Sequence, residues 1–367
     1  MPIRKYFDNI NLLRGFAAIT VVIYHFIEIN KWLEFPTSGL LVWFRAGWMA
    51  VDLFFVISGF VVGLAIFYDI NSTVKGSDNN YKRKFFINRF ARIFPLYLLT
   101  LSISLIFVNP NLIFDHLLKN IFLHVFFLQN LFLEYRDSLN GVTWSLAPEV
   151  QFYLILLFFA PLLLRAKIGI LLIVFIGVAW FFRAGLFSQF TTAITLWSAS
   201  TNIFGVIDEF GIGFILSRIY FTPWGEKLFK SNPFNLTLWL SLTLIVGYIC
   251  QSFYWSIPDY YGSISPYTFL KTLLAISFGL LILCFCSLQV TGIYRVALSP
   301  LYYLGTISYG IYLWHLPILA SINRVVGVPP TYQLAILLIT SILAASMSWH
   351  FFEKPIIDKY RKLQKSY

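Results

Sequence analysis

The chain has 367 residues, of which 59% are hydrophobic and only 12% are charged, and its mean hydropathy is +0.76. These values lie far outside the range of soluble globular domains and exclude an ordinary cytosolic enzyme. The net charge of +11 could indicate a nucleic-acid partner, but in so apolar a chain the positions of the charges are the better test. We therefore expect an all-α polytopic membrane protein, with membrane lipids and no nucleic acid among its partners.

The hydrophobic runs predict about ten transmembrane helices. They cover residues 11–29, 48–68, 91–109, 148–164, 168–182, 203–220, 235–253, 268–288, 302–322 and 333–352. The first run lacks a small-residue cleavage site, which favours a retained helix over a signal peptide. Since no polar stretch is long enough for a separate soluble domain, we expect one transmembrane domain over residues 1–367.

The distribution of Lys and Arg predicts the orientation of these helices. With the N-terminus placed in the cytoplasm, 20 of the 27 basic residues fall on the cytoplasmic side. The seven outside are Lys31, Arg45, Lys119, Arg136, Arg183, Lys271 and Arg324. The positive-inside rule therefore predicts that both termini are cytoplasmic.

The first hydrophobic run, residues 11–29, carries two ionisable side chains at membrane depth, Arg14 and His25. In a helix their spacing corresponds to about three turns, so both lie on one face, with His25 about 16 Å further into the membrane. Ionisable groups at this depth usually face a site or a pathway rather than lipid. A lone His in a helix can also be a buried structural imidazole.

The second run, residues 47–68, contains Asp52 as its only acid. Asp52 lies near the external end of this helix, where its carboxylate could cap the backbone N–H groups of the first turn. It could equally orient the His25 imidazole and support its basicity. The small residues Ser58 and Gly59 predict a close contact with another helix.

The third run begins in a basic segment that contains Arg89 and Arg92, three residues apart and hence on one helical face. One interpretation is an ordinary positive-inside anchor. The other is an anion site at the cytoplasmic surface, to which Arg14 would contribute a third guanidinium suited to phosphate.

Residues 110–147 predict a short helix followed by a loop on the external side. His116 and His124 could share a face of that helix, but no further ligands accompany them, so no metal site is expected. In the following run, Trp144 and Tyr153 suit a membrane interface. Glu149 lies at the external end of the fourth helix. The simplest alternative to a role in catalysis is that its negative charge caps the first turn and stabilises the positive end of the helix dipole.

Later runs carry two further polar features. Asp208 and Glu209 are adjacent at membrane depth and point to different faces, which argues against a paired-carboxylate site. His315 precedes Pro317 in the ninth run, and a proline there frees a backbone carbonyl and often marks a cavity. His315 could be a structural residue or a residue of the functional site. The seventh and eighth runs are interpreted as scaffold.

Several motifs together resemble the acyltransferase-3 family of integral membrane O-acyltransferases, over nearly the whole chain. They are Arg14 with His25, GWMAVDLFFVISGF (47–60), NRFARIFPLY (88–97), WSLAPEVQFY (144–153), SYGIYLWHLPI (308–318) and FFEKP (351–355). The chain departs from the family where Asn88 precedes Arg89 in place of a double Arg. Some family members also carry a fused esterase-like domain outside the membrane; we expect none here and a separate partner for any transfer that needs one.

The resemblance implies transfer of an acyl group, commonly acetyl from acetyl-CoA, to a hydroxyl of an extracytoplasmic or lipid-linked glycan such as a surface polysaccharide or lipopolysaccharide. It implies a bacterial inner-membrane enzyme with His25 as the catalytic residue. Arg14, Arg89 and Arg92 would bind the acyl-CoA phosphates at the cytoplasmic side. The expected substrate-binding residues are Trp144, Ser145 and His315.

We expect neutral His25 to act as general base on the acceptor hydroxyl, with Asp52 orienting the imidazole and Glu149 contacting the acceptor or relaying the proton. An acyl-His intermediate is the alternative chemistry. A different class, a proton-coupled transporter or glycan flippase, would also place His, Asp and Arg in the membrane. The absence of a paired half-chain pattern argues against that class.

Overall fold

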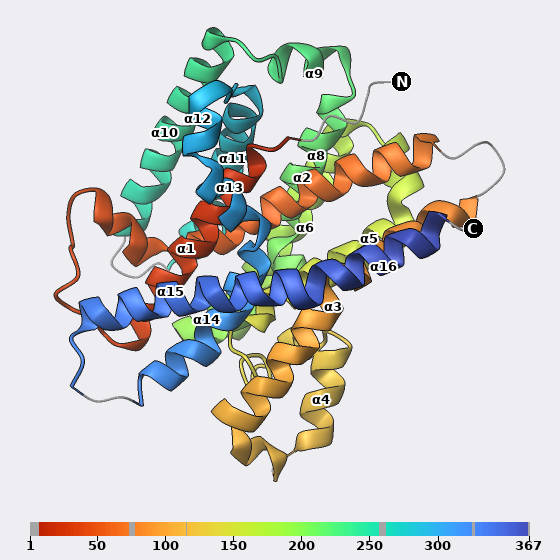
Figure 1. The fold of residues 1–367 in the computed structure, drawn as a ribbon. Coiled ribbons are helices and arrows are strands. Elements are labelled where there is room, and N and C mark those ends of the chain that lie inside the picture. The colour runs from red at the N-terminus through yellow and green to blue at the C-terminus, as the bar shows by residue number, and fades with distance from the viewer. Residues whose placement is uncertain (1–6, 73–77, 115, 257–261, 325–326, 366–367) are drawn as a thin grey trace. The chain divides into compact units, whose positions relative to one another are not determined.

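The structure, a computed structural model, describes residues 7–72, 78–114, 116–256, 262–324 and 327–365. All regular elements in these ranges are helices, which confirms the predicted all-α class (Figure 1). Three cations assigned to the cytoplasmic side, Arg4, Lys5 and Lys75, lie outside the described residues. The chain forms two compact units. Met1–Ile10, Asp52–Asp78 and Ser145–Val296 make the first, and Asn11–Val51, Asn79–Trp144 and Ala297–Tyr367 make the second.

The first unit is built mainly from long apolar helices. Its elements are α2 (Met49–Ser72, which begins in the second unit), α5 (Leu146–Arg165), α6 (Ile168–Gln189), α7 (Ala193–Ser200), α8 (Ile203–Tyr220), α9 (Pro223–Leu228), α10 (Pro233–Ser256), α11 (Ile264–Ser287) and α12 (Gly292–Ala297). Helix α8 is central, because it packs against α5, α6 and α11 and its side chains from Ile203 to Ser217 are almost all buried.

The second unit contains most of α1 and the C-terminal end of the described chain. Its elements are α1 (Ile10–Ile29), η1 (Leu40–Ala46), α3 (Asp78–Ile103), η2 (Ser104–Val108), η3 (Pro110–Ile113), α4 (Leu117–Val125), η4 (Gln129–Leu131), η5 (Thr143–Ser145, shared with the first unit), α13 (Ser299–Thr306), α14 (Ser308–Ile322), α15 (Pro330–Ser348), η6 (Trp349–Glu353) and α16 (Lys354–Lys365). Elements α15, η6 and α16 follow one another as a continuous rod, drawn in blue in Figure 1. The short α4 and the loop after it confirm the expected organisation of residues 110–147.

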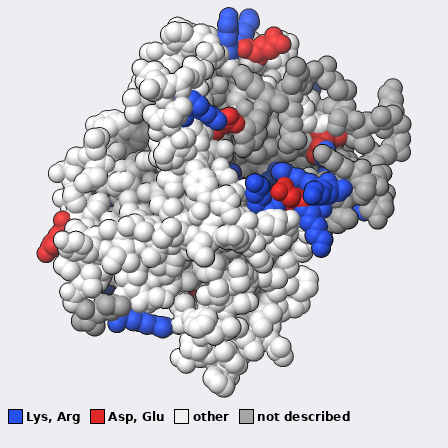
Figure 2. Space-filling model, viewed as in Figure 1, with Lys and Arg blue, Asp and Glu red and all other residues white. Residues whose placement is uncertain are grey.

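Eight helices among the described residues are long and apolar enough to cross a membrane. Two of the ten expected spans are not among them. Helix α8 has the expected bounds but carries Asp208, Glu209 and Arg218, and the ninth run is broken at Ile307 into α13 and α14. The face drawn in Figure 2 is mostly uncharged, as a lipid-facing surface requires, with its densest basic group over α16.

Helices α2 and α8 approach so closely that no side chain fits between them at two points. A Cβ on Gly59 would lie 2.1 Å from the carbonyl oxygen of Phe210, and a Cβ on Gly213 would lie 2.0 Å from that of Val56. The predicted close contact at Gly59 is confirmed. Small residues allow backbones in membrane proteins to pack in this way, where dispersion rather than the hydrophobic effect drives association.

Gly213→Ala should therefore destabilise the protein by about 1–3 kcal/mol, because the new methyl group forces α2 and α8 apart. The thermal unfolding midpoint of the purified protein in detergent measures this change. The matched control is Gly177→Ala in α6, where a Cβ meets nothing within 4 Å. That control should leave the midpoint unchanged or raise it, since alanine is the better helix former. Equal midpoints for the two variants would contradict the close contact.

Candidate functional site

Two histidines from distant parts of the sequence meet in the second unit. His25 on α1 and His315 on α14 have ring centroids 5.1 Å apart and an interplanar angle of 30°. Nδ1 of His25 lies 3.0 Å from Nε2 of His315. His315 is fully buried, whereas His25 is half-buried, so of the two residues only His25 retains accessible surface.

The neighbours of this pair assign the protons when both rings are neutral. Nδ1 of His315 lies 3.2 Å from the carbonyl oxygen of Ile311, which can only accept a hydrogen bond, so this nitrogen carries the proton. Nε2 of His315 is then an acceptor, and Nδ1 of His25 must donate to it. The remaining nitrogen of His25, Nε2, keeps its lone pair. The arrangement therefore leaves a base on the more open ring.

The position of His315 depends on a proline in its own helix. Pro317 has no N–H, so the carbonyl of Leu313 loses its partner within the helix. Nδ2 of Asn140 donates to that carbonyl at 3.0 Å, and Oη of Tyr312 donates to the carbonyl of Val142 at 3.0 Å. The expectation that Pro317 frees a backbone carbonyl is confirmed, and the freed group anchors α14 beside the histidine pair.

The continuous helix α1 also carries Arg14, so the predicted spacing of Arg14 and His25 along one helix is confirmed. Arg14 is half-buried. Near it, α1 packs closely on α13, because a Cβ on Gly305 would lie 1.9 Å from the carbonyl oxygen of Asn11. The backbone around Arg14 is thereby fixed, with the guanidinium about 16 Å from the level of His25 along the helix.

Arg89 and Arg92 lie on α3 and are half-buried as well. The guanidinium of Arg89 lies 5.8 Å from the ring centroid of Phe85. Arg92 acts electrostatically on Glu353, which is buried in the π-helical turn η6 and accepts a hydrogen bond from Ser348 at 3.2 Å. Oη of Tyr309 on α14 donates to the carbonyl of Ile93 at 2.7 Å, tying this part of α3 to the helix of His315. Two of the three predicted phosphate ligands thus lie on a helix bonded to α14.

Glu149 lies in the first unit, in the first turn of α5, and is bound by two hydroxyl groups. Its Oε1 accepts hydrogen bonds from Oγ of Ser58, at 2.7 Å, and from Oη of Tyr153. The two hydroxyls are themselves 3.0 Å apart. The residue is half-buried, and the two hydroxyl groups orient its carboxylate. The sequence had suggested only a membrane-interface role for Tyr153.

The two predicted substrate-binding residues before α5 differ in exposure. Trp144 is half-buried and Ser145 is buried, both in the 3-10 turn η5. This turn forms the boundary between the two units, with Trp144 closing a segment of the second and Ser145 opening one of the first. Their contact with substrate stays a prediction.

Asp52 lies in the first unit and is nearly fully buried in the first turn of α2. Its Oδ1 is 3.4 Å from Nζ of Lys271 on α11. The carboxylate of Asp52 therefore has the ammonium of Lys271 as its partner within the first unit. In the second unit, the partner of Nδ1 of His25 is His315. The predicted role of Asp52 in orienting His25 stays a prediction.

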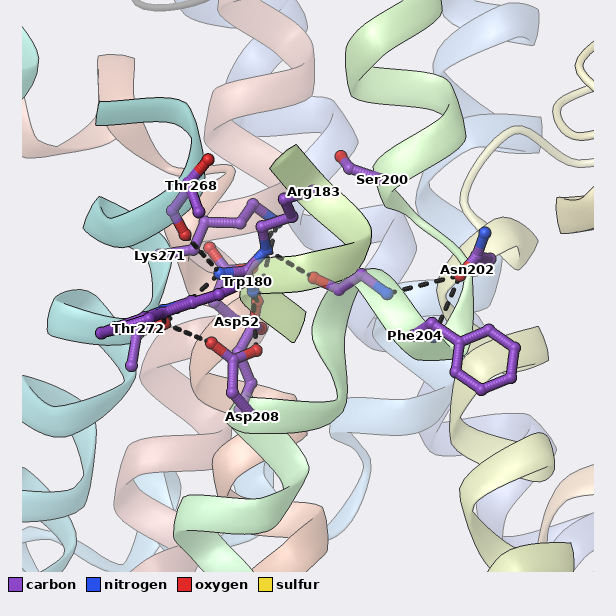
Figure 3. Close-up of polar contacts among 12 residues, drawn as sticks. Asp52, Trp180, Arg183, Ser200, Asn202, Phe204, Asp208, Thr268, Lys271 and Thr272 are labelled. Atoms are coloured by element: carbon purple, nitrogen blue, oxygen red, sulfur yellow. Dashed lines mark hydrogen bonds and ion pairs between the residues drawn. The ribbon is translucent and has the colours of Figure 1, made fainter. Parts of the chain in front are cut away.

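Sequence reasoning overlooked the basic members of a buried ionic cluster around Asp52 (Figure 3). Arg183 on α6 pairs with Asp208 on α8, with NH2 2.6 Å from Oδ1, and both side chains are fully buried. Arg183 and Lys271 had been counted among the external cations. The signal that could have identified them is their position, each a single cation inside an apolar helix that needs an acidic partner.

No group of three or more His, Cys, Asp or Glu in the described part of the chain is arranged to hold a metal ion. His116 is exposed at the N-terminus of α4, whereas His124 is fully buried at its other end. Nδ1 of His124 lies 2.9 Å from the carbonyl oxygen of Asn120, which fixes the proton on that nitrogen. His124 is therefore part of the packing of α4.

Burial lowers the pKa of His124 from 6.5 to about 4, because desolvation disfavours the charged ring. In the unfolded chain the ring takes up a proton near pH 6.5, so acid favours unfolding. The free energy of unfolding should fall by about 3 kcal/mol between pH 6.5 and pH 4 through this group. Chemical denaturation across that pH range, for the parent and for His124→Gln, isolates the effect.

The pH-dependent part of stability should shrink in His124→Gln, whereas His116→Gln, which removes an exposed imidazole of the same helix, serves as the matched control. If both variants lose stability in acid as steeply as the parent, His124 is not the group that titrates.

Comparison with known proteins gives one family. A protein-family model described as an acyltransferase domain, of the acyltransferase-3 type, matches residues 7–350. YrhL of Bacillus subtilis is 27% identical over 380 residues, with 96% of this chain and 55% of YrhL covered. OatA of Listeria monocytogenes, named a peptidoglycan O-acetyltransferase, is 25% identical over 382 residues, with 96% and 56% covered.

OatA of Staphylococcus aureus, named an O-acetyltransferase, is 26% identical over 377 residues, with 97% of this chain and 58% of that protein covered. The chain thus spans little more than half the length of these relatives. No solved structure matches it.

Proposed function

The chain belongs to the acyltransferase-3 family, and from this premise we propose that it is a membrane O-acyltransferase that moves an acetyl group to a hydroxyl of a glycan. The names of the two OatA relatives support acetyl as the group and an O-acetylated product. The donor in this proposal is cytoplasmic acetyl-CoA, and the acceptor is an extracytoplasmic or lipid-linked glycan. The observation that carries the proposal is the His25–His315 pair, which leaves an unprotonated nitrogen on the half-buried ring.

The proposal includes ten membrane crossings with both termini in the cytoplasm of a bacterial cell. Eight candidate spans are supplemented by α8, whose Asp208 pairs with Arg183 of α6, and by α13 with α14, which together are long enough to cross. Arg183 and Lys271 no longer count against the positive-inside rule, because they are buried with acids inside helices. The exposed cations of α16, Lys354, Lys359, Arg361 and Lys362, fit a cytoplasmic surface next to anionic lipid.

At the cytoplasmic side, the guanidinium groups of Arg14, Arg89 and Arg92 would bind the phosphates of the donor. Arginine suits this task because its fork of N–H groups matches a phosphate bidentately and keeps its charge at any physiological pH. The rise of about 16 Å from Arg14 to His25 along α1 is comparable to the length of a pantetheine arm. The thioester could therefore reach His25 while the nucleotide of CoA stays bound at the cytoplasmic side.

The reaction follows from the protons assigned to the two rings. Nε2 of His25 takes the proton of the acceptor hydroxyl, and the oxygen attacks the thioester carbonyl carbon. The carbon–sulfur bond breaks, and the thiolate leaves with the proton returned from the imidazolium. The hydrogen bond from Nδ1 of His25 to His315 holds the ring in the required tautomer. Glu149, held by Ser58 and Tyr153, would accept a hydrogen bond from an acceptor sugar or relay the proton.

The donor side is tested by binding of a non-hydrolysable acetyl-CoA analogue to the purified protein. Arg89→Ala and Arg92→Ala should each weaken binding about 10-fold or more, since each removes a charge-assisted hydrogen bond worth about 1.5–3 kcal/mol. The matched control is Arg83→Ala, an exposed cation on the same helix. Undiminished binding in both variants would contradict the donor site.

The acceptor side is tested by mass spectrometry of cell-envelope glycans from cells with and without the gene. The proposal expects a mass difference of one acetyl group on a glycan unit. If acetylation is unchanged and a labelled glycan instead crosses the membrane of reconstituted vesicles in a protein-dependent manner, the chain is a transporter or flippase rather than a transferase.

A further inference from the structure

The first unit contains a buried ionic cluster drawn from four helices. Its members are Asp52 on α2, Arg183 on α6, Asp208 and Glu209 on α8 and Lys271 on α11. The side chains of Arg183, Asp208 and Glu209 are fully buried, and those of Asp52 and Lys271 are at most 11% exposed. Figure 3 shows the Arg183 side chain above Asp208 with Thr272 beside them.

One part of the cluster is a completed ion pair. NH2 of Arg183 lies 2.6 Å from Oδ1 of Asp208, and Oγ1 of Thr272 donates to Oδ2 of Asp208 at 2.5 Å. Nε of Arg183 donates to the carbonyl of Gly205 at 2.8 Å, and NH1 donates to that of Thr268 at 3.0 Å. Both oxygens of Asp208 thus have hydrogen-bond donors, and one of the donors is a cation.

Glu209 is in a different situation, although it is adjacent to Asp208. Both of its carboxyl oxygens are buried and have no hydrogen-bond donor among the described residues. Its nearest cations are Nζ of Lys271 at 3.7 Å and NH2 of Arg183 at 3.8 Å from Oε1, both beyond hydrogen-bonding distance. A buried carboxylate without a donor is costly to keep ionised.

Lys271 also forms an ion pair with Asp52, since its Nζ lies 3.4 Å from Oδ1 of that residue. The second oxygen of Asp52, Oδ2, is buried and has no donor among the described residues. Two carboxyl groups, those of Glu209 and Asp52, therefore share a single ammonium. Across the whole cluster three acids face two bases, which leaves one negative charge to be neutralised.

Among the described residues, the charged groups of the neighbouring helices α5, α7 and α9 do not supply that neutralisation. On α5, which packs against α8, Glu149 and Tyr153 are bonded to Ser58 instead. Helix α7 has no titratable side chain. On α9, Glu226 and Lys227 are exposed.

We propose that Glu209 holds an exchangeable proton at neutral pH, in a buried proton-binding site formed with Asp52 and Lys271. The ligand is a proton rather than a metal ion, because the ammonium of Lys271 already occupies the space between the two carboxyl groups. When the proton leaves the O–H of Glu209 and binds Oδ2 of Asp52, the negative charge moves from Asp52 to Glu209. The ammonium beside both groups stabilises either arrangement, and the net charge of the cluster does not change.

Infrared spectroscopy of the purified protein in lipid nanodiscs at neutral pH tests this site, independently of acyl transfer. A protonated carboxylic acid gives a carbonyl band above the amide region, and this band shifts on exchange into deuterated water. We expect such a band in the parent and its loss in Glu209→Gln, which keeps the size and removes the acid. Glu149→Gln is the matched control in the same unit and should keep the band. An unchanged band in Glu209→Gln would overturn the proposal.

A second measurement needs no variant. Dicyclohexylcarbodiimide is apolar and reacts with protonated carboxylic acids, whose oxygen adds to its central carbon while the proton moves to its nitrogen. Peptide mass spectrometry should find the adduct on Glu209, with a yield that falls as pH rises, and no adduct on Asp208. Labelling of Asp208 with Glu209 unlabelled would also overturn the proposal.

Discussion

His25→Ala should lower the rate of acyl transfer by about 10²–10⁴-fold, which is the contribution typical of a general base. The substitution removes the only ring nitrogen of the His25–His315 pair that is unprotonated and open to an incoming hydroxyl. The phosphates of acetyl-CoA would still be bound by Arg14, Arg89 and Arg92, so the affinity of the variant for the donor should stay within a few-fold of that of the parent. The measurement is acetate released from glycans of cells that produce each variant, together with donor binding to the purified protein.

The matched control is His350→Gln. This imidazole lies in η6, between α15 and α16, with Nε2 3.1 Å from Oη of Tyr303, and it has no part in the proposed chemistry. Activity of the control should stay close to that of the parent. If His25→Ala retains parental activity in the same cells, the proposed base is wrong.

The two proposed chemistries are separated by incubating the parent with labelled acetyl-CoA and no acceptor. Direct transfer expects no label on the protein. A covalent acetyl group recovered on His25 would show that transfer passes through an acyl-His intermediate.

His315→Leu should lower the catalytic rate by about 10–100-fold, the range found when the partner of a functional imidazole is removed. Leucine keeps the buried volume but cannot accept a hydrogen bond from Nδ1 of His25. The His25 ring then keeps its hydrogen bond to the backbone of Val21 but loses the contact with the second imidazole, so the proton is less firmly held on Nδ1 and can move to the nitrogen that should act as base. In the proposed mechanism the acceptor hydroxyl meets Nε2 of His25 and not this atom pair, so the loss should appear in kcat and leave KM little changed; a raised KM would instead indicate the substrate-binding role expected for His315.

His315→Gln distinguishes this positioning role from a merely structural one. The glutamine carbonyl oxygen can accept the same hydrogen bond, so this variant should recover part of the lost kcat at similar thermal stability. Ser321→Ala, which removes a hydroxyl near the end of α14, is the control for changes in the helix itself. Equal activity of the Leu and Gln variants would argue that the hydrogen bond is unimportant.

Much of the local structure could be predicted from the sequence. Helices α1 and α8 have nearly the expected bounds, and the positions of Gly59 and Pro317 correctly indicated a close helix contact and a freed carbonyl. These features depend on residues near one another in the chain. Hydrophobic periodicity and backbone chemistry are sufficient for them.

The partner of His25 could not be predicted in this way. His315 lies 290 positions further along the chain, and no periodicity relates two residues at that distance. The same holds for Lys271, which is 219 positions from Asp52. The break between α13 and α14 was also missed, because residues 302–322 are apolar throughout and hydropathy does not register the change of helix at Ile307. Tertiary pairing decided each of these features.

The interleaving of the two units has a consequence for biosynthesis. The first unit is complete only after Val296 has been made, and α14 follows it. Throughout most of translation and membrane insertion, His25 is therefore present without the ring that orients it. A truncated chain released from the ribosome before α14 would carry the arginines and the base but not the pair, so we expect it to consume the donor far more slowly than the whole chain.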